Sequence, residues 1–505
     1  MRHGLRVISL LVGSFLFAGQ GVAAPAYDGK NFLLLDRLTF GATASEAARL
    51  KAMGANHWLE AELYPPLADN LPAQVQQEIN ALDMKPMDAR VADFAAKVKA
   101  LKAITDSDLR VAASHAYQQE LNDCAKQAAS RAILRDLYSP SQLREVMTWF
   151  WFNHFNVHQY KADIRAMVGD YEDTIRAHAL GHFRDLLEAT LRHPAMLRYL
   201  DNAQNAAGHI NENYAREIME LHTLGVGSGY TQQDVEALAH ILTGVGVDVA
   251  TNPPRVKPAL QDQVVRDGLF MFNPARHDYS DQILLGHKIK GAGFSEVEEA
   301  LDILARSPAT ARHISRELAT YFVADDPPAS LVDKMSKTFL HSNGDIAAVL
   351  RTMIDAPEFS ASSAPKFQKF KDPVRYVMSA VRLAYEDKVI LNTQPVQNWL
   401  NRLAEGLYNY QTPDGYPSVS SAWDGPGQIE TRFEIARQIG SGSAGLFKPD
   451  MPGAADDPAF PQFENALYFD GLQQTLRPAT RAVLDEAQSP QDWNVLFLSS
   501  PDFMR

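Results

Sequence analysis

The sequence has almost no cysteine. Its 505 residues include a single one, Cys124, so no disulfide can form within the chain. The haem-attachment pattern C-x-x-C-H is absent as well, which argues against a c-type cytochrome. A chain of this length buries enough apolar surface to fold without covalent cross-links. We therefore expect packing alone to stabilise the fold.

Clusters of basic residues are also missing. The chain carries 48 lysines and arginines against 61 aspartates and glutamates, which gives a formal net charge of −13. Nucleic-acid binding requires Lys and Arg gathered on one surface, where they neutralise phosphates. The composition therefore argues against nucleic acid as a partner.

A long apolar run occurs only near the start of the sequence. Residues 5–18 are mostly apolar, Arg2 and Arg6 make the start basic, and small residues follow. This order is typical of a secretory signal peptide, and the run is too short to anchor a protein in a membrane. We predict a signal peptide over residues 1–26, cleaved after Ala23 or Ala26. The mature chain is then expected to be periplasmic or secreted, without an integral membrane segment.

Several catalytic motifs are absent from the sequence. It contains no G-x-S-x-G, no P-loop and no H-E-x-x-H. The string "GSGSAG" at 440–445 has the G-x-G-x-x-G spacing, but it follows a helical stretch and does not open a helix. We interpret it as a flexible loop. Common serine hydrolases, nucleotide-binding enzymes and helical zinc proteases therefore lose support.

Helical periodicity dominates what is present, and alternating strand patterns are nearly missing. Ser141 and Thr231 stand where helix N-caps are expected. We predict an all-α fold, a multi-helix globular bundle with long irregular loops and little or no sheet. Apolar residues recur at helical spacing over 130–138, 142–158, 164–180, 183–191, 212–224, 232–242, 295–305, 308–323 and 346–356.

Composition divides the mature chain into two parts. We predict a main helical domain over 27–360, which includes an irregular insertion with a short hairpin at 250–292. A C-terminal helical part follows over 361–505. It contains an aromatic Gly/Pro loop at 406–427, "GLYNYQTPDGYPSVSSAWDGPG", which is too long for a simple connection.

Two histidines lie in the most aromatic helical stretch, "WFWFNHFNVH" at 149–158. On a continuous helix His154 and His158 share one face, so both rings can reach one metal ion. A helix that is apolar all round is normally buried, and buried imidazoles need partners. The alternative is that both are core histidines, hydrogen-bonded to carbonyls or carboxylates.

A second polar cluster follows in "NENYAREIMELHTLG" at 211–225. Glu217 and Glu220 share one helical face, where mutual repulsion can raise the pKa of one carboxyl, as in a general acid. His222 lies on the opposite, apolar face and is a candidate metal ligand. The alternative is a solvated helix face with an ion pair between Arg216 and Glu220.

Three further groups are weaker candidates. The loop dyad of His277 and Asp278 resembles a pair that orients a ligand imidazole. We interpret the basic side chains of the 308–323 helix as structural or anion-facing, and the aromatic side chains of the 406–427 loop as either a cap on the core or a platform for sugar rings. These two groups are Arg312, His313 and Arg316, and Tyr408, Tyr410, Tyr416 and Trp423.

Six blocks are distributed along the chain in this order: "LLDRLTFGAT", "QLREVMTWFWFNHF", "NENYAREIMELHTLGVGSGYTQQDVEALAHILTG", "HDYSDQILLG", "SPATARHISRELATYFVADDPP" and "YQTPDGYP". Together they resemble the bacterial domain-of-unknown-function family 1800. The resemblance implies an exported, mainly helical protein, often encoded beside a second secreted family that looks like the alkaline-phosphatase superfamily. It supplies no agreed activity and no catalytic residues. One departure is Val245, where relatives typically carry Trp.

Two hypotheses for the function follow. The first is an exported metal-dependent enzyme, a hydrolase or oxidoreductase, with a divalent ion held by His154, His158 and His222 and with Glu217 and Glu220 as catalytic carboxyls. The second is a non-catalytic binding protein that acts with a secreted partner resembling the alkaline-phosphatase superfamily. In that case the histidines are structural.

Overall fold

A computed structural model describes residues 29–505 of the chain. Its gaps are residues 69, 83–84, 251–253, 255, 362–366, 387, 391, 450–454, 456–458, 462 and 464–466. The predicted signal peptide, residues 1–26, lies outside the described residues. Among the helices that are described, none combines the length and apolar content needed to cross a bilayer.

The fold is mainly α-helical, as predicted. The helices up to the first strand are α1 (Gly29–Leu38), α2 (Ala44–Met53), α3 (Ala55–Leu63), α4 (Ala73–Ala81), α5 (Met87–Ala103), α6 (Ser107–Tyr138), α7 (Gln142–His154), η1 (Ile164–Ala166), α8 (Val168–His178), α9 (Phe183–Arg192), α10 (Pro194–Tyr199), η2 (Asn202–Gln204), α11 (Asn213–Glu220) and α12 (Gln232–Ile241). The helices after the last strand are α13 (Phe294–Ala305), α14 (Pro308–Phe322), α15 (Ala329–His341), α16 (Ile346–Ile354), α17 (Pro357–Ser360), α18 (Pro373–Tyr385), α19 (Gln394–Arg402), η6 (Ser420–Ala422), α20 (Pro426–Gly440), the π-helix η7 (Tyr468–Leu472), α21 (Gln473–Thr475), α22 (Pro478–Leu484) and α23 (Pro490–Leu498).

The strands are short and stand between α12 and α13. They are β1 (Val245–Val247), β2 (Val265–Asp267), β3 (Phe270–Phe272), β4 (Gln282–Leu284) and β5 (His287–Ile289), with the 3₁₀ turns η3 (Pro258–Gln263) and η4 (Pro274–Arg276) among them. One antiparallel sheet has the order β1-β3-β2 and the other is the hairpin β4-β5. Both β1 and β2 pair with β3, so that Val245 and Val265 flank Phe272.

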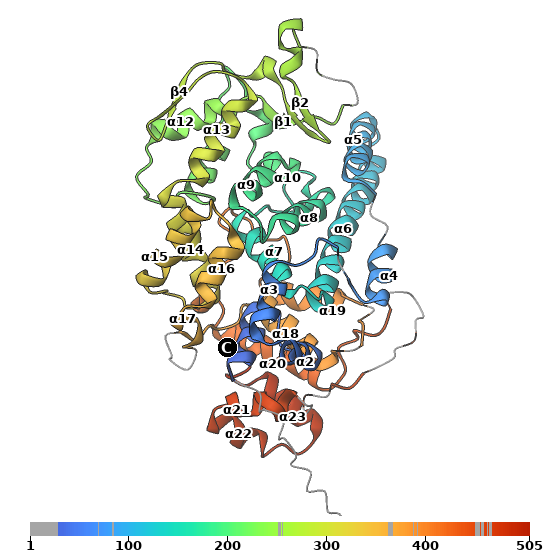
Figure 1. Ribbon diagram of the computed structural model, residues 1–505. Coiled ribbons are helices and arrows are strands. Elements are labelled where there is room, and N and C mark those ends of the chain that lie inside the picture. Colours follow the sequence, from blue (N-terminus) through green and yellow to red (C-terminus); the bar gives the residue numbers. More distant parts are fainter. Residues whose placement is uncertain are drawn as a thin grey trace, which may run out of the picture.

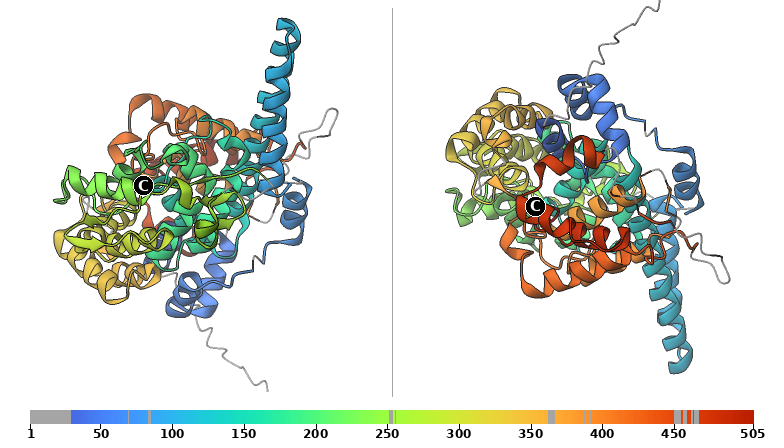
Figure 2. Two further views of the ribbon diagram at one scale, coloured as in Figure 1. Left: turned by 90° about the horizontal axis from the view of Figure 1, so that it is seen from above. Right: turned by 90° about the horizontal axis from the view of Figure 1, so that it is seen from below.

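Helix α7 lies in the middle of the molecule, with α8 to α10 on one side and α14 and α16 on another (Figure 1). Every residue of α7 except Asn153 is buried. Its aromatic rings contact distant segments: Trp151 lies 5.8 Å from Phe183, and Phe152 lies 4.9 Å from Tyr408. Helices α5 and the first part of α6, by contrast, project from the body as a long hairpin (Figure 2). The aromatic stretch is therefore the interior helix that the sequence indicated.

Two predicted helices end earlier in the structure than their apolar periodicity suggested. Helix α7 ends at His154 because Phe155 leaves helical geometry at φ −104° and ψ 48°. The Asn156 side chain then donates to the carbonyls of Tyr410 and Thr412, which fixes the chain outside the helix. Helix α11 ends at Glu220, two residues before His222. The prediction that these helices carry His158 and His222 is therefore wrong.

The start of α7 is held by a residue from another helix. Ser141, the predicted cap, makes no capping hydrogen bond with its side chain. Instead, Glu62 of α3 accepts the Leu143 backbone N–H at 2.9 Å. A carboxylate at this place satisfies a free N–H group and complements the positive end of the helix dipole. Glu62 also lies 3.3 Å from Arg49 and is fully buried. Packing of α3 against α7 thus supplies the missing cap.

We expect Glu62→Gln to change how stability depends on pH. Burial is the main cause that raises the pKa of Glu62 from 4.5 to about 7. A carboxyl whose pKa is raised by folding makes the native state bind more protons than the unfolded state. The free energy of unfolding therefore falls as pH rises from 4.5 towards 7, by about 3 kcal/mol at most. Gln keeps the acceptor for Leu143 but does not titrate, so the variant should lose this decline. Urea unfolding at pH 5 to 8 measures it.

Glu430→Gln on α20 is the matched control, because Glu430 is exposed. Its pH profile should follow that of the wild type. If the profile of Glu62→Gln also follows the wild type, Glu62 is ionised in the native state at pH 5 and the proposed cause of the decline is wrong.

Candidate metal centre

The structure brings together two of the three predicted metal ligands. The rings of His154 and His222 have their centroids 5.9 Å apart, although 68 residues separate them along the chain. His158 lies elsewhere: its ring stands 5.5 Å from that of Tyr160, and burial lowers its pKa. In the described part of the chain no ring contact or hydrogen bond joins His158 to the other two. His154 and His158 therefore do not face one ion as predicted, because helix α7 ends at His154 and the two side chains no longer share a helical face.

Helix α14 adds two side chains that were not predicted as ligands. The His154 Nδ1 atom lies 2.6 Å from Glu317 Oε2, and His313 Nε2 lies 3.5 Å from Glu317 Oε1. The rings of His154 and His313 are 6.1 Å apart. One potential ligand atom from each of these three residues lies within 4.8 Å of the other two. Across the described residues this is the one group of at least three such side chains, and we call it the His–Glu cluster.

Helices α7 and α14 position the side chains of the His–Glu cluster. His154 is the last residue of the buried helix α7, and its ring packs edge-on against Trp151 and Phe155. His313 and Glu317 are four residues apart on α14, so both stand on the same face of that helix. The cluster is thus built where the end of α7 meets the middle of α14.

Backbone carbonyls at the end of α11 fix the two imidazole rings. His154 Nε2 lies 3.0 Å from the carbonyl oxygen of His222, and His313 Nε2 lies 3.0 Å from that of Leu221. A carbonyl can only accept, so each of these nitrogens donates. In a neutral His154 ring, Nδ1 then carries a lone pair that faces the Glu317 carboxylate. This arrangement is favourable only when positive charge, a proton or a metal ion, lies between them.

Glu317 gives the cluster contact with solvent. Its side chain is 36% exposed and that of His313 is 21% exposed, whereas the His154 side chain is 3% exposed. Burial acts to raise the pKa of Glu317, but the charge and hydrogen bond of His154, together with His313, hold it below its usual value. The carboxylate is therefore ionised near neutral pH and faces two imidazoles from the solvent side.

His222 is fully buried beside the cluster. Neither of its ring nitrogens has a hydrogen-bond partner among the described residues. Burial, followed by the nearby His154 and His313, lowers its pKa well below the usual value, so the ring is neutral. Buried polar atoms without partners are uncommon in native proteins and often mark a bound water, ion or functional role.

The two predicted catalytic glutamates stand outside the His–Glu cluster. Glu217 and Glu220 lie on the partly exposed side of α11. The pKa of Glu217 is raised by burial, then by Glu220 and by Asp414 of the aromatic loop. Arg216 pairs with Glu212 at 2.9 Å, not with Glu220 as the alternative interpretation had it. The raised pKa expected at Glu217 is present, whereas its role as a general acid stays a prediction; the histidines are not among the groups that raise this pKa.

The weaker candidates are structural contacts. His277 is buried and lies 2.9 Å from Glu296 Oε1, while Asp278 lies 2.7 Å from His240. These are two separate pairs, so His277 and Asp278 do not form a dyad. Arg312 makes a surface ion pair with Asp333.

The aromatic loop covers α7, in agreement with its interpretation as a cap. Tyr408 is buried and its hydroxyl donates to Glu172 at 3.0 Å. Tyr416 packs 6.3 Å from Trp149 and its hydroxyl donates to the Gly406 carbonyl. The rings of Tyr408 and Tyr416 therefore pack in the core and are not available to stack on a sugar.

The sequence did contain a signal for the two missed residues. In "ARHISRELA", His313 and Glu317 have the four-residue spacing that places two ligands on one helical face. Sequence reasoning interpreted His313 together with its arginine neighbours as structural or anion-facing. Only the meeting of α14 with the end of α7 distinguishes this spacing from an ordinary polar helix face.

A family model described as "Protein of unknown function (DUF1800)" matches residues 33–505, which is nearly the whole chain. No curated protein and no solved structure matches the sequence or the fold.

Proposed function

The chain belongs to the DUF1800 family of proteins of unknown function, and we propose that this member is an exported metal-dependent enzyme whose divalent ion is held by His154, His313 and Glu317. The observation that carries the proposal is the convergence of two imidazoles and one carboxylate from two separate helices within 4.8 Å.

The donor set fits a catalytic metal better than a structural one. Structural zinc sites are usually closed by four protein ligands, whereas catalytic sites keep three ligands and one open position. Two histidines and one glutamate are a common catalytic set for zinc hydrolases. Two histidines and one carboxylate also hold non-haem iron(II) in oxidoreductases. The exposed edge of Glu317 leaves the cluster open to solvent on one side.

The residues behind the ligands support the same assignment. Metal-ligating histidines usually donate their second ring N–H to a carbonyl or carboxylate, which fixes the tautomer. His154 does so through Nε2 to the His222 carbonyl and keeps Nδ1 directed at Glu317. The carbonyls of Leu221 and His222 also form the negative end of the α11 segment, which favours positive charge. The surroundings thus orient the ligands and attract a cation.

The bound ion would supply a water of lowered pKa or a site for dioxygen. Glu317 would hold the ion from the solvent side and His154 from the core side through Nδ1. His313 would join them by exchanging the hydrogen bond from its Nε2 to the Leu221 carbonyl for the ion. The neutral His222 ring is buried close by with unpartnered nitrogens, so it can make hydrogen bonds to a water molecule or a ligand group inside the site. The identity of the metal decides between hydrolysis and oxidation.

We predict that the protein purified without a polyhistidine tag contains about one divalent transition-metal ion per chain. Removal of the ion by a chelator should lower the melting temperature, because a ligand that binds only the folded state stabilises it. Inductively coupled plasma mass spectrometry and thermal unfolding measure the two effects. Zinc would favour hydrolysis, and iron or manganese would favour oxidation. If no stoichiometric ion is present and the melting temperature is unchanged after chelation and after metal addition, the proposal fails.

A second candidate function is non-catalytic binding, with a secreted protein resembling the alkaline-phosphatase superfamily as the partner. The specific observation in its favour is that His313 Nε2 is already engaged by the Leu221 carbonyl and His154 Nε2 by the His222 carbonyl. In this alternative both rings are caps for the carbonyls that follow α11, and His154 forms an ion pair with Glu317 without a metal. In that case His313→Asn would lower stability without affecting any bound metal, and co-purification with the partner would survive it.

We propose that the protein works outside the cytoplasm, on the basis of the apolar segment at 5–18. Expression of the full chain in a Gram-negative host should give a mature form that begins just after Ala23 or Ala26. N-terminal sequencing of the periplasmic fraction tests this. Retention of an uncleaved chain in the cytoplasm would contradict it. A replacement of Leu10 and Leu11 by arginine should abolish cleavage, because it interrupts the apolar run.

A further inference from the structure

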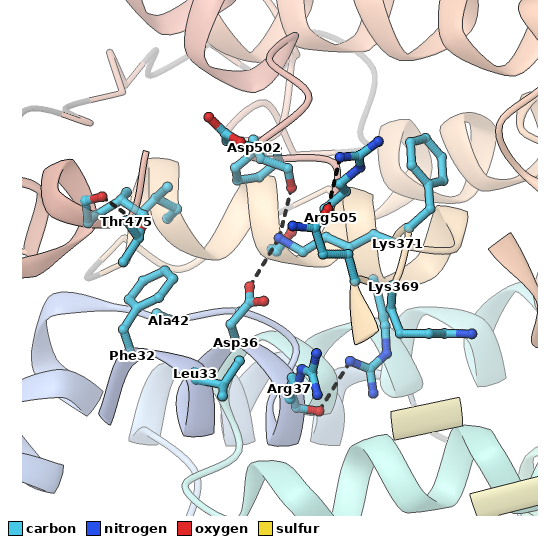
Figure 3. A pocket seen from close by; sticks show the side chains of 18 of the residues that line it. Phe32, Leu33, Asp36, Arg37, Ala42, Lys369, Lys371, Thr475, Asp502 and Arg505 are labelled. Atoms are coloured by element: carbon cyan, nitrogen blue, oxygen red, sulfur yellow. Dashed lines mark hydrogen bonds and ion pairs between the residues drawn. The ribbon is translucent and has the colours of Figure 1, made fainter. Parts of the chain in front are cut away.

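A cavity of about 230 Å³ lies where helix α1, helix α18 and the last residues of the chain meet (Figure 3). It is separate from the His–Glu cluster. Tyr321 on its wall is one helical turn beyond Glu317 on α14, and Phe150 packs against both Tyr321 and His154. Its contents would therefore not touch the cluster while these rings stay in place.

Basic side chains outnumber acidic ones in the lining of this cavity, although the protein as a whole is acidic. Five basic side chains line it, against three acidic ones: Arg37, Lys369, Lys371, Arg375 and Arg505, with Asp36, Asp372 and Asp502. Two of the five have close carboxylate partners. Lys371 Nζ lies 3.2 Å from Asp36, and Lys369 pairs with Asp325. The positive charges of the three arginines have no carboxylate partner this close in the described part of the chain.

Arg37 is buried, Arg375 beside it is largely buried, and neither guanidinium has a carboxylate of the described chain within hydrogen-bonding distance. Arg37 donates to the carbonyl oxygens of Phe359 and Phe367, and no carboxylate among the described residues forms an ion pair with it. Burial lowers its pKa to about 10, with Arg375 acting in the same direction. In Arg375, Nε and one terminal nitrogen have no hydrogen-bond partner, and the Asp372 carboxylate stands 3.9 Å from Nε. Buried charges are normally paired. Among the described residues only Asp372 forms an ion pair with these two guanidinium groups, at the long distance of 3.9 Å, so they can take a further anion.

The rim of the cavity carries a fifth basic group. Arg505 is exposed, and its guanidinium donates to the Gln368 side chain at 3.0 Å instead of to a carboxylate. Figure 3 shows that Arg505, Lys371 and Lys369 gather on one side of the cavity. Positive charge is thus concentrated on that side.

The opposite side is apolar. Phe32, Leu33 and Ala42 stand there, away from the basic groups (Figure 3). Further aromatic and aliphatic side chains complete the lining: Phe322, Leu383, Leu467, Leu472, Leu476, Phe497 and Phe503. An inorganic anion would leave this half of the cavity unfilled, and a neutral hydrocarbon would leave the guanidinium groups without an anion.

We propose that this cavity binds an amphipathic anion, a carboxylate or phosphate head attached to an aliphatic chain. The head lies against Arg37 and Arg375, with Arg505 at the entrance, and the chain lies against the apolar wall near Phe32 and Leu33. Arginine suits this task because its planar fork binds carboxylate and phosphate oxygens in pairs.

The test is binding of decanoate to the full mature protein, measured by isothermal titration calorimetry before and after metal removal. We expect saturable one-site binding in both preparations, with decanol and acetate each at least 10-fold weaker. A comparison of decyl phosphate with decanoate identifies the preferred head group. The ligand that binds more tightly shows whether the natural ligand is a phosphate or a carboxylate. Equal binding of decanol and decanoate would overturn the proposal, as would the absence of saturable binding. Because metal-free protein is included, the result does not depend on the metal proposal.

Two variants locate the site. Arg375→Gln should weaken decanoate binding at least 10-fold, and Arg505→Gln should weaken it by a smaller factor without affecting the fold, because Arg505 is exposed. Arg481→Gln on α22 is the matched control: it removes the same charge from an exposed position that does not line the cavity. Wild-type affinity in both Arg375→Gln and Arg505→Gln, or an equal loss in Arg481→Gln, would place the binding elsewhere and overturn the assignment.

Discussion

Replacing Glu317 with glutamine is expected to weaken divalent-metal binding by at least about 100-fold while the helices stay folded. The carboxylate is the single anionic member of the His–Glu cluster and lies between His154 and His313. Even the loss of a hydrogen-bond partner behind a metal ligand typically costs about 10- to 100-fold in affinity, and Glu317 is proposed as a ligand itself. Competition with a chromophoric chelator measures the change, and circular dichroism reports the fold.

Glu299→Gln is the matched control, because Glu299 is an exposed carboxylate on α13 outside the cluster. It should bind metal as the wild type does. His154→Asn and His313→Asn should each reproduce the loss seen in Glu317→Gln if all three residues hold one ion. Wild-type affinity in Glu317→Gln would show that the metal binds elsewhere. Loss of affinity in His154→Asn alone would reject the three-ligand arrangement.

Gly415→Ala is expected to destabilise the protein by about 2–4 kcal/mol. Gly415 has φ +68°, a region that costs other L-residues energy. An added Cβ would lie 2.1 Å from the Asn153 carbonyl oxygen and 2.8 Å from its carbon. Both are backbone atoms near the end of α7, so the aromatic loop would have to move away from the helix that it covers. Chemical unfolding measures the loss.

Gly427→Ala gives the comparison within the same stretch of chain. Gly427 is in the first turn of α20, and an added Cβ would meet nothing within 4 Å. Alanine has the higher helix propensity, so this variant should be neutral or slightly more stable. Equal stability of Gly415→Ala and the wild type would mean that the loop is not packed tightly on α7. In that case the loop could not fix the position of Asn153 and His154.

Much of the fold follows from local sequence. The spacing of apolar residues predicted helices at α7, α12, α13 and α14, because a helix that buries one face needs such residues at every third or fourth position. The capping box at Thr231 and Asp234 formed as expected, since it depends on residues three positions apart. The burial of α7 on all sides was also predicted, because its aromatic residues leave no polar face.

The candidate site depended on tertiary contacts. Apolar periodicity continues past His154 and Glu220, so only the contacts of Asn156 with the aromatic loop show where α7 ends. His154 and His222 were expected to meet, but their meeting with His313 and Glu317 required the packing of α14 against the end of α7.

The sequence by itself therefore determined that this is a mainly α-helical member of its family with a buried aromatic helix and histidines in its interior. The tertiary structure decided which of those histidines share a site, which carboxylate faces them, and that Glu62 from α3 caps α7. The physical reason is the separation along the chain of the residues that interact. Periodicity and capping act between residues a few positions apart, whereas ligand sets and buried charges depend on segments that the chain brings together only when it folds.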